Sequence, residues 1–322
     1  MDAERPPVAG ADYPRSIQEF ESRFADEAFC RAYLMRLRWP SGFRCPRCGS
    51  TKQPWLTGRG LMHCGACGRQ ASVTAGTVFE GTHKPLRSWF RAMWFVTSQK
   101  HGASALGLKR VLELGSYETA WTWLHKLRRA MVRPGRDRLT GAVEVDETYV
   151  GGPEEGVSGR ETQDKALVAV AAEKRGRLTG RIRLRHIHDA SAVCLASFVE
   201  ESITPGSLVH TDGWSGYEGL PALGYRHKAT AIKHSGREAH QLLPRVHKVA
   251  SLLKRWLLGT HQGGVQPQHL DYYLDEFTFR FNRRTSRSRG LLFYRLVQQA
   301  AATAPAPYQA LVGGKLPADP NL

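Results

Sequence analysis

The stretch CPRCGSTKQPWLTGRGLMHCGAC, residues 45–67, contains two CxxC pairs separated by fifteen residues. A structural zinc ion takes four thiolates in a tetrahedron, and each CxxC turn supplies two of them, usually with a small residue after the pair. Gly49 and Gly68 occupy these following positions, and His63 is a competing ligand beside the second pair. A redox motif would need only one pair. The spacing therefore predicts a zinc ribbon with Zn²⁺ bound by Cys45, Cys48, Cys64 and Cys67.

Helical patterns lie on both sides of this ribbon. Apolar residues recur at three- and four-residue steps over residues 16–39, with a break near Asp26, and again from Leu86. Residues 102–114 and 116–131 then form two helical patterns joined at Gly115, an order typical of a helix-turn-helix. The second of them would read DNA through Lys126, Arg128 and Arg129, although a solvated basic face explains these residues equally well.

The pattern changes from helical to alternating after the linker-like sequence RPGRDRLTG, residues 133–141. Strands are predicted over 141–150, 165–174, 180–187 and 206–217, and helices over 191–203, 246–259 and 268–284. This order predicts a mixed α/β domain behind a helical region.

The charge of the chain is +17 and is distributed unevenly. Residues 41–140 carry 17 basic and 4 acidic residues, and residues 241–322 carry 11 and 4, whereas residues 141–240 carry 12 and 14. Two basic regions around an acidic one favour a nucleic-acid partner and argue against an acidic partner or a neutral metabolite. The longest purely apolar run, ALVAVAA, is far shorter than the roughly 20 residues of a membrane span. No secretory signal is visible, so we expect a cytoplasmic protein in a reducing compartment.

Two aspartates stand where apolar strands are predicted to end. Asp146 lies in VEVDETYVGG and Asp212 in LVHTDGWSGY. Each aspartate taken alone is explained equally well as a turn-capping residue, because Asp beside Gly is common in turns. In a chain that is built to bind phosphates, the pair predicts a cage for two Mg²⁺ or Mn²⁺ ions about 3.5–4 Å apart.

Further candidates lie in the last two predicted helices. His247 and Lys254 share one helix face, and His247 is a candidate for a metal ligand or a phosphate contact. Glu276 could also complete the site, but a helix salt bridge with Arg280 is the preferred interpretation. A basic patch suited to phosphate binding is formed by Arg280, Arg283, Arg284 and Arg287.

Most of the chain, from about residue 43 to about residue 298, resembles the IS1595 (ISXO2-like) insertion-sequence transposases. The resemblance rests on FRCPRCGS, HCGACGRQASVTAGTVFEGT, SWFRAM, VEVDETYVGG, VHTDGWSGY and the long stretch from VHKVASLLKRWLLG to FRFNRR. It implies a zinc-ribbon amino-terminal domain and an RNase H-like catalytic domain that cleaves and transfers DNA strands at terminal inverted repeats. The implied segments are a helical region (1–40), the ribbon (41–82), a helical DNA-binding region (83–135), the catalytic domain (140–298) and a flexible tail (299–322).

The resemblance makes Asp146 and Asp212 the first two catalytic carboxylates and also matches Lys254. Family members often carry Asn two residues before this Lys, where the present chain has Leu252, so His247 and Glu276 compete for the third metal ligand. The implied partner is double-stranded DNA, both element ends and target, bound by a homo-oligomer associated with the bacterial nucleoid. The alternatives are a catalytically inactive zinc-ribbon DNA-binding protein, either a regulator or a disabled element remnant, and a related structure-specific nuclease.

Overall fold

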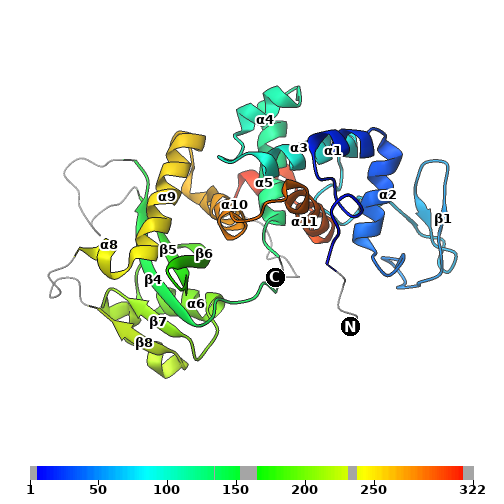
Figure 1. Cartoon of the computed structure of the whole chain (residues 1–322). Helices are drawn as coiled ribbons and strands as arrows, with labels where there is room; N and C mark the ends of the chain where they lie inside the picture. The colour runs from blue at the N-terminus through cyan, green and yellow to red at the C-terminus, as the bar shows by residue number, and fades with distance from the viewer. Residues whose placement is uncertain (1–5, 134, 153–164, 231–237, 315–322) are drawn as a thin grey trace. The chain divides into compact units, whose positions relative to one another are not determined.

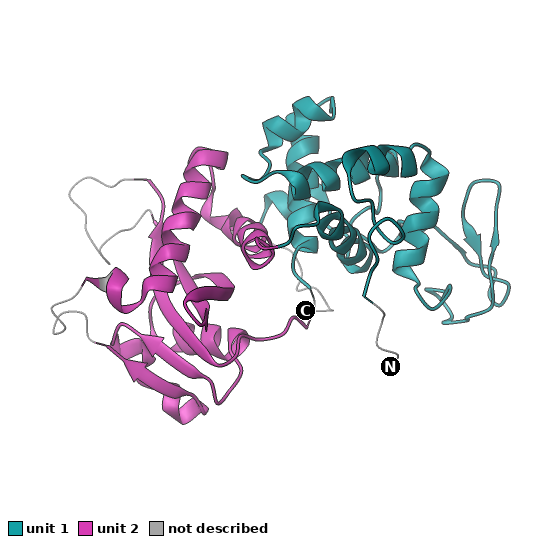
Figure 2. Ribbon diagram, viewed as in Figure 1, with its two compact units in different colours: residues 1–134, 286–322 teal, residues 135–285 magenta. Residues whose placement is uncertain are grey.

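The computed structural model describes residues 6–133, 135–152, 165–230 and 238–314 (Figure 1). The chain divides into two compact units (Figure 2). Unit 1 combines Met1–Pro134 with Ser286–Leu322, and unit 2 consists of Gly135–Thr285. The chain therefore leaves the first unit, builds the second and returns to the first.

The helices of unit 1 follow the predicted apolar periodicity. The predicted break near residue 26 is confirmed, because the Asp26 side chain accepts the Ala28 N–H and so begins a new helix there. Ser116 caps another helix in the same way through the Thr119 N–H. The helices of the described part of unit 1 are α1 (Ile17–Arg23), α2 (Glu27–Arg38), α3 (Leu86–Ser98), α4 (Ala105–Val111), α5 (Tyr117–Ala130), α11 (Arg289–Ala302) and α12 (Tyr308–Val312).

An aromatic cluster joins the two chain segments of unit 1. Phe293 of α11 is fully buried, and its ring centroid lies 5.3 Å from that of Phe20, 5.6 Å from that of Phe24 and 5.7 Å from that of Phe90. Close approach of the backbone adds to this packing, because a Cβ at Gly290 would lie 1.6 Å from the Pro14 carbonyl oxygen. Helix α11 is thus part of the core of unit 1.

This packing corrects two predicted boundaries. The catalytic domain was expected to end at residue 298 and a flexible tail to begin at residue 299, but both positions lie inside α11. Ala300 and Ala301 fall in the predicted flexible tail, yet both side chains are buried because small residues allow close helix packing. The last part of the predicted tail, residues 315–322, lies outside the described residues.

We expect Phe293→Ala to destabilise unit 1 by about 3–5 kcal/mol, since it leaves a cavity among aromatic rings. Urea unfolding followed by tryptophan fluorescence measures this loss. Phe29→Ala is the matched control, because Phe29 is 65% exposed on α2 and its removal should change stability by less than about 0.5 kcal/mol. Equal losses in the two variants would contradict the assignment of α11 to this core.

Unit 2 is built on one five-stranded sheet. Its strands are β4 (Ala142–Val150), β5 (Ala166–Arg175), β6 (Leu178–Ile187), β7 (Leu208–Thr211) and β8 (Arg226–Ala229). Their order across the sheet is β6-β5-β4-β7-β8. The pairs β6–β5 and β5–β4 are antiparallel, whereas β4–β7 and β7–β8 are parallel. The sequence did not predict β8, whose residues Arg-His-Lys-Ala form a largely exposed edge strand without alternating apolar residues.

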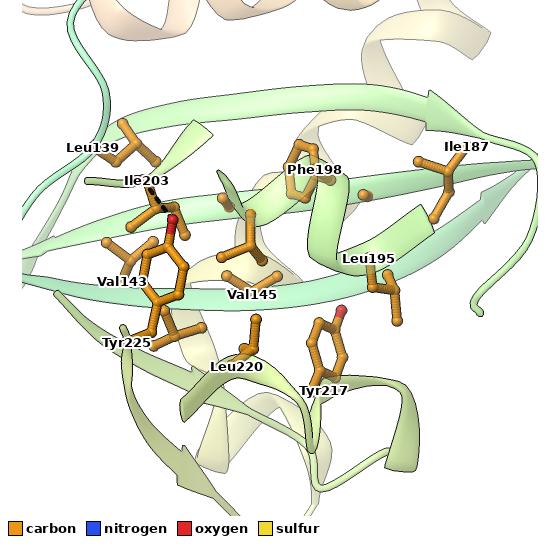
Figure 3. Close-up of a cluster of buried hydrophobic side chains, with 14 of the residues drawn as sticks. Leu139, Val143, Val145, Ile187, Leu195, Phe198, Ile203, Tyr217, Leu220 and Tyr225 are labelled. Carbon is orange, nitrogen blue, oxygen red and sulfur yellow. Dashed lines mark hydrogen bonds between the residues drawn. The ribbon is translucent and has the colours of Figure 1, made fainter. Parts of the chain in front are cut away.

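Helices cover both faces of this sheet. They are α6 (Ala192–Ser202), α8 (Ala239–Leu242), α9 (Pro244–His261) and α10 (Leu270–Asn282), with 3₁₀ turns η2 (Ser215–Tyr217), η3 (Leu220–Leu223) and η4 (Pro267–His269). Val143 and Val145 of β4 point into a cluster with Phe198 of α6, which Figure 3 shows together with Tyr217. On the other face, Val170 of β5 packs with residues of α9 and α10.

Helix α10 also covers the open edge of β6. The Asp271 carboxylate accepts the His186 N–H at 3.0 Å, and Asn282 accepts the Ile182 N–H at 2.8 Å and donates to the Ile182 carbonyl at 3.1 Å. These side chains replace the strand that would otherwise pair there.

Candidate functional sites

The four predicted zinc ligands come together in the ribbon. Its sheet consists of β1 (Trp55–Leu56), β2 (Met62–His63) and β3 (Gln70–Ala71) in sequence order. The four Sγ atoms all lie within 4.8 Å of one another, and Cys45–Cys67 and Cys48–Cys64 are each 3.7 Å apart. A tetrahedron with Zn–S bonds of about 2.3 Å has edges of roughly this length. Within the residues that the structure describes, this is the one group of three or more Cys, His, Asp or Glu side chains whose ligand atoms lie close enough together to hold a metal ion.

The local backbone explains why each CxxC pair is followed by glycine. Gly49 and Gly68 have φ angles of +69° and +70°, a region that other residues rarely adopt. Their N–H groups donate to the carbonyls of Cys45 and Cys64 at 2.9 Å, which closes each turn. Backbone N–H groups directed at the Cys45 sulfur also lower the pKa of its thiol and so favour the thiolate. His63 stacks on Trp55, with ring centroids 3.9 Å apart.

The two predicted catalytic aspartates belong to neighbouring parallel chain segments, Asp146 to β4 and Asp212 to the residue directly after β7. The register between β4 and β7 pairs Val143 with Val209 and Glu144 with His210. Two residues further along each strand are Asp146 and Asp212. Asp146 lies within β4, where it pairs with Val170 of β5, rather than at the predicted strand end. Asp212 directly follows β7, and one of its oxygens accepts the Trp214 N–H at 3.0 Å, so it also has the turn role considered for it.

Helix α9 brings His247 to this pair. His247 Nε2 lies 3.5 Å from Asp146 Oδ2, and the side chains of His247 and Asp146 are 31% and 16% exposed. Nε2 itself is buried and has no hydrogen-bond partner among the described residues. Burial lowers the pKa of His247, as do the nearby charges of His240 and Lys254, and the carboxylates of Glu144 and Asp212 oppose this shift. The imidazole is therefore favoured in its neutral form.

Lys254 lies on the exposed face of α9, two helical turns after His247. Burial of part of the side chain lowers its pKa, and the charge of Lys165 at the start of β5 adds to this effect. His247 thus lies close to Asp146 and within electrostatic range of both Asp212 and Lys254.

A second carboxylate of β4 reaches the opposite face of the sheet. Glu147 accepts the Tyr217 hydroxyl at 2.9 Å. Burial raises the pKa of Tyr217 well above its ordinary value, and the charges of Glu147, Asp146 and Asp212 raise it further. The Tyr217 phenol therefore stays protonated and donates a hydrogen bond to the Glu147 carboxylate. The sequence analysis assigned Glu147 no role, although the alternation of β4 places it opposite Asp146.

The competing third ligand, Glu276, is positioned elsewhere. It is fully buried in α10, and its Oε1 accepts from Arg280 Nε and Nη2 at 2.8 Å. The preferred interpretation of this residue as a helix salt bridge is therefore confirmed. Leu252, where family members often have Asn, packs against the hydrophobic cluster between α9 and the sheet.

The basic residues of α5 are less exposed than a DNA-reading helix would suggest. Arg128 is 2% exposed and lies 3.4 Å from His125. Arg129 donates to the carbonyls of Ala304 and Pro305, and burial lowers the pKa of Lys126. DNA contact by these three residues stays a prediction, and the packing of Arg128 points to a role within unit 1.

Two residues of the late arginine patch are also engaged in unit 2. Arg283 stacks over Phe279 and Arg284 over Phe281, each at 4.0 Å. Arg284 also donates to the carbonyls of Thr179 and Gly180, which ties the end of α10 to β6. Arg287 is exposed. None of the described helices has the length and apolar character needed to cross a bilayer.

Two family models and one curated relative match this chain. Residues 138–282 match the family model of the ISXO2-like transposase domain, and residues 25–70 match that of the transposase zinc-ribbon domain. The first match spans nearly all of unit 2, including both aspartates and His247. The chain is also 29% identical over 289 residues to an uncharacterized protein in transposable element ISH50 of Halobacterium salinarum, an alignment that covers 80% of this chain and 91% of that protein.

Proposed function

We propose that this chain, which matches the transposase and zinc-ribbon domain models of the IS1595 family, binds the terminal inverted repeats of an insertion sequence and cleaves and transfers DNA strands there. The observation that carries the proposal is that Asp146 and Asp212 each stand two residues beyond the last paired positions of the parallel strands β4 and β7, with His247 Nε2 3.5 Å from Asp146 Oδ2. A homo-oligomer fits this function, because two element ends must be held together during transfer.

We assign unit 2 an RNase H-like fold. Support comes from the order β6-β5-β4-β7-β8, in which three antiparallel strands are followed by two parallel ones. The acidic residues sit where the first strand of the unit meets the fourth. Ligands of open α/β sheets bind at the carboxyl ends of parallel strands.

The residues of this site fit divalent cations. Two carboxylates from neighbouring strands offer the oxygen ligands that Mg²⁺ and Mn²⁺ prefer, and His247 Nε2 is a buried nitrogen without a hydrogen-bond partner among the described residues. Asp146 and Asp212 would hold the ions, and the ligand atom of His247 would have to move closer to join them, because these three side chains do not form a preassembled ligand group among the described residues. When bound, such ions activate the attacking oxygen and stabilise the leaving oxygen in phosphoryl transfer.

In this proposal, individual side chains of the protein have different roles. Asp146 and Asp212 supply the negative charge of the site, and Lys254 supplies a cation for a DNA phosphate on the exposed face of α9. Tyr217 keeps Glu147 hydrogen-bonded on the other face of β4. This bond holds Glu147 away from the DNA side of the strand.

Strand-resolved analysis of an end-labelled inverted-repeat DNA tests the function. We expect nicked and joined products when the purified protein, Mn²⁺ or Mg²⁺ and the DNA end are combined. Nicked products without joined ones would identify a structure-specific nuclease. Binding without any product would identify an inactive DNA-binding protein and overturn the proposal.

The third ligand can be tested by three substitutions at equal zinc content. We expect His247→Ala to lower the cleavage rate by about 100-fold, the size typical for removal of an electrostatic group at a reacting centre. Glu276→Gln should instead lower stability by about 3–5 kcal/mol, because it removes the buried negative charge that faces Arg280, with cleavage per folded molecule unchanged. Leu252→Asn should also lower stability and leave cleavage per folded molecule unchanged, because Leu252 packs against the hydrophobic cluster. Loss of cleavage in folded Glu276→Gln but not in His247→Ala would make Glu276 the third ligand.

A further inference from the structure

The amino terminus of helix α9 lacks a cap of its own. The N-cap position is Leu243, whose side chain makes no capping hydrogen bond, and Pro244 follows it. The first turn of a helix leaves several N–H groups without an intrahelical acceptor, and burial of such groups without partners is costly. His247 stands in this same turn, and its N–H donates to the Leu243 carbonyl at 3.3 Å.

Glu144 of β4 supplies the missing acceptor from a distant part of the chain. Its Oε2 accepts the N–H groups of Arg245 at 2.6 Å and Val246 at 3.2 Å. A carboxylate at this end of a helix is also stabilised by the helix dipole. Glu144 is only 4% exposed, so both interactions take place in a buried environment.

Arg245 balances the buried charge of Glu144. Its Nη1 lies 2.6 Å from Glu144 Oε1, and the side chains of Arg245 and Glu144 are 13% and 5% exposed. The same guanidinium donates to the carbonyls of Gly176 at 2.9 Å and Leu178 at 3.4 Å, at the turn between β5 and β6. The first turn of α9 is therefore fixed to two places on the sheet.

We propose that Glu144 and Arg245 are positioning residues that set His247 against Asp146. Glu144 and Asp146 are two residues apart on β4 and therefore point to the same face of the sheet. One strand thus carries Asp146 directly and determines the place of His247 through the cap. The catalytic part of this inference rests on the proposed function, whereas the cap itself does not.

The proposal also explains how three carboxylates on one short stretch avoid competing for the same cations. Both oxygens of Glu144 are engaged by α9, and Glu147 is bound to Tyr217 on the opposite face. Asp146 is the member of the three that faces His247. Glu144 is thus close to the site in sequence without being a ligand.

Hydrogen exchange tests the cap independently of catalysis. The variant Glu144→Met with Arg245→Met removes the capping acceptor and both charges together, so that no buried charge is left unpaired and the chain can fold. The matched control is Glu173→Met with Arg181→Met, an ion pair of 2.6 Å between β5 and β6 in which Glu173 also accepts backbone N–H groups. We expect the amides of Val246 and His247 to exchange at least about 10-fold faster in the first variant and unchanged in the control. Unchanged exchange in both overturns the cap.

Cleavage and Mn²⁺ affinity test the positioning role. We expect the Glu144/Arg245 variant to lose about 10- to 100-fold in both, the usual effect of removing a group that orients a metal ligand, with zinc content and affinity for the DNA end unchanged. The control should stay within about twofold of wild type. Wild-type cleavage and Mn²⁺ affinity combined with faster amide exchange would leave a purely structural cap and overturn the positioning role. A wild-type protein that neither cleaves DNA nor binds Mn²⁺ would overturn the proposed function and this positioning role with it, while the exchange result for the cap would stand.

Discussion

Asp146→Asn and Asp212→Asn are each expected to abolish cleavage of an inverted-repeat DNA end while the DNA end is still bound. Each change removes one negative charge from the paired strand positions and keeps the size of the side chain. An electrostatic group at a reacting centre is typically worth about 100- to 1000-fold in rate, so each variant should cleave at least that much more slowly than wild type. Denaturing gels of the labelled strand measure cleavage, and gel shift measures binding.

Glu200→Gln is the control for this pair. It removes the same charge from an exposed position on α6, which covers the other face of the sheet. We expect it to cleave at the wild-type rate. Cleavage by Asp146→Asn or Asp212→Asn at the rate of Glu200→Gln would show that the site has been placed wrongly.

Removal of zinc is the change with the largest expected effect on structure. The ribbon has three strands of two residues each, which cannot bury enough apolar surface to fold alone. Structural zinc in comparable small modules contributes about 10–16 kcal/mol of apparent binding free energy, and this energy is also their folding energy. We therefore expect one zinc per chain in the purified protein and loss of ordered ribbon resonances in Cys45→Ala, while those of unit 2 persist.

Cys194→Ala provides the comparison, because Cys194 belongs to α6 and lies outside the four-cysteine group. This variant should retain one zinc per chain. A wild-type protein without zinc, or a Cys45→Ala variant with an ordered ribbon, would contradict the assignment. Metal analysis of the three proteins side by side decides between these outcomes.

Local patterns in the sequence predicted a large part of this structure. The CxxC spacing identified the four cysteines, and three- and four-residue periodicity located α3, α5, α9 and α10 to within a few residues. Both signals lie within a short window of chain. The sequence also placed Asp146 and Asp212 at the ends of two apolar strands, but Asp146 lies inside β4, and their role as a site stays a prediction.

Other features depend on contacts between distant segments, which one sequence does not reveal. Nothing in VEVDE distinguishes Glu144, which caps a helix a hundred residues away, from Asp146, which faces His247. The burial of Arg128 contradicts the usual preference of arginine for the surface, so a surface role was the natural expectation. Strand β8 was missed because an edge strand needs no apolar pattern.

The return of the chain to unit 1 sets an order of events during synthesis. A ribosome releases residues 135–285 as one continuous stretch, so unit 2 can fold while the last helices are still being translated. The packing of unit 1 cannot be completed from residues 1–134 alone. Phe20, Phe24 and Phe90 remain incompletely buried until Phe293 has emerged from the ribosome. A message cut short after unit 2 would thus yield a folded unit 2 attached to an unfinished amino-terminal unit, with exposed aromatic surface that invites degradation or aggregation.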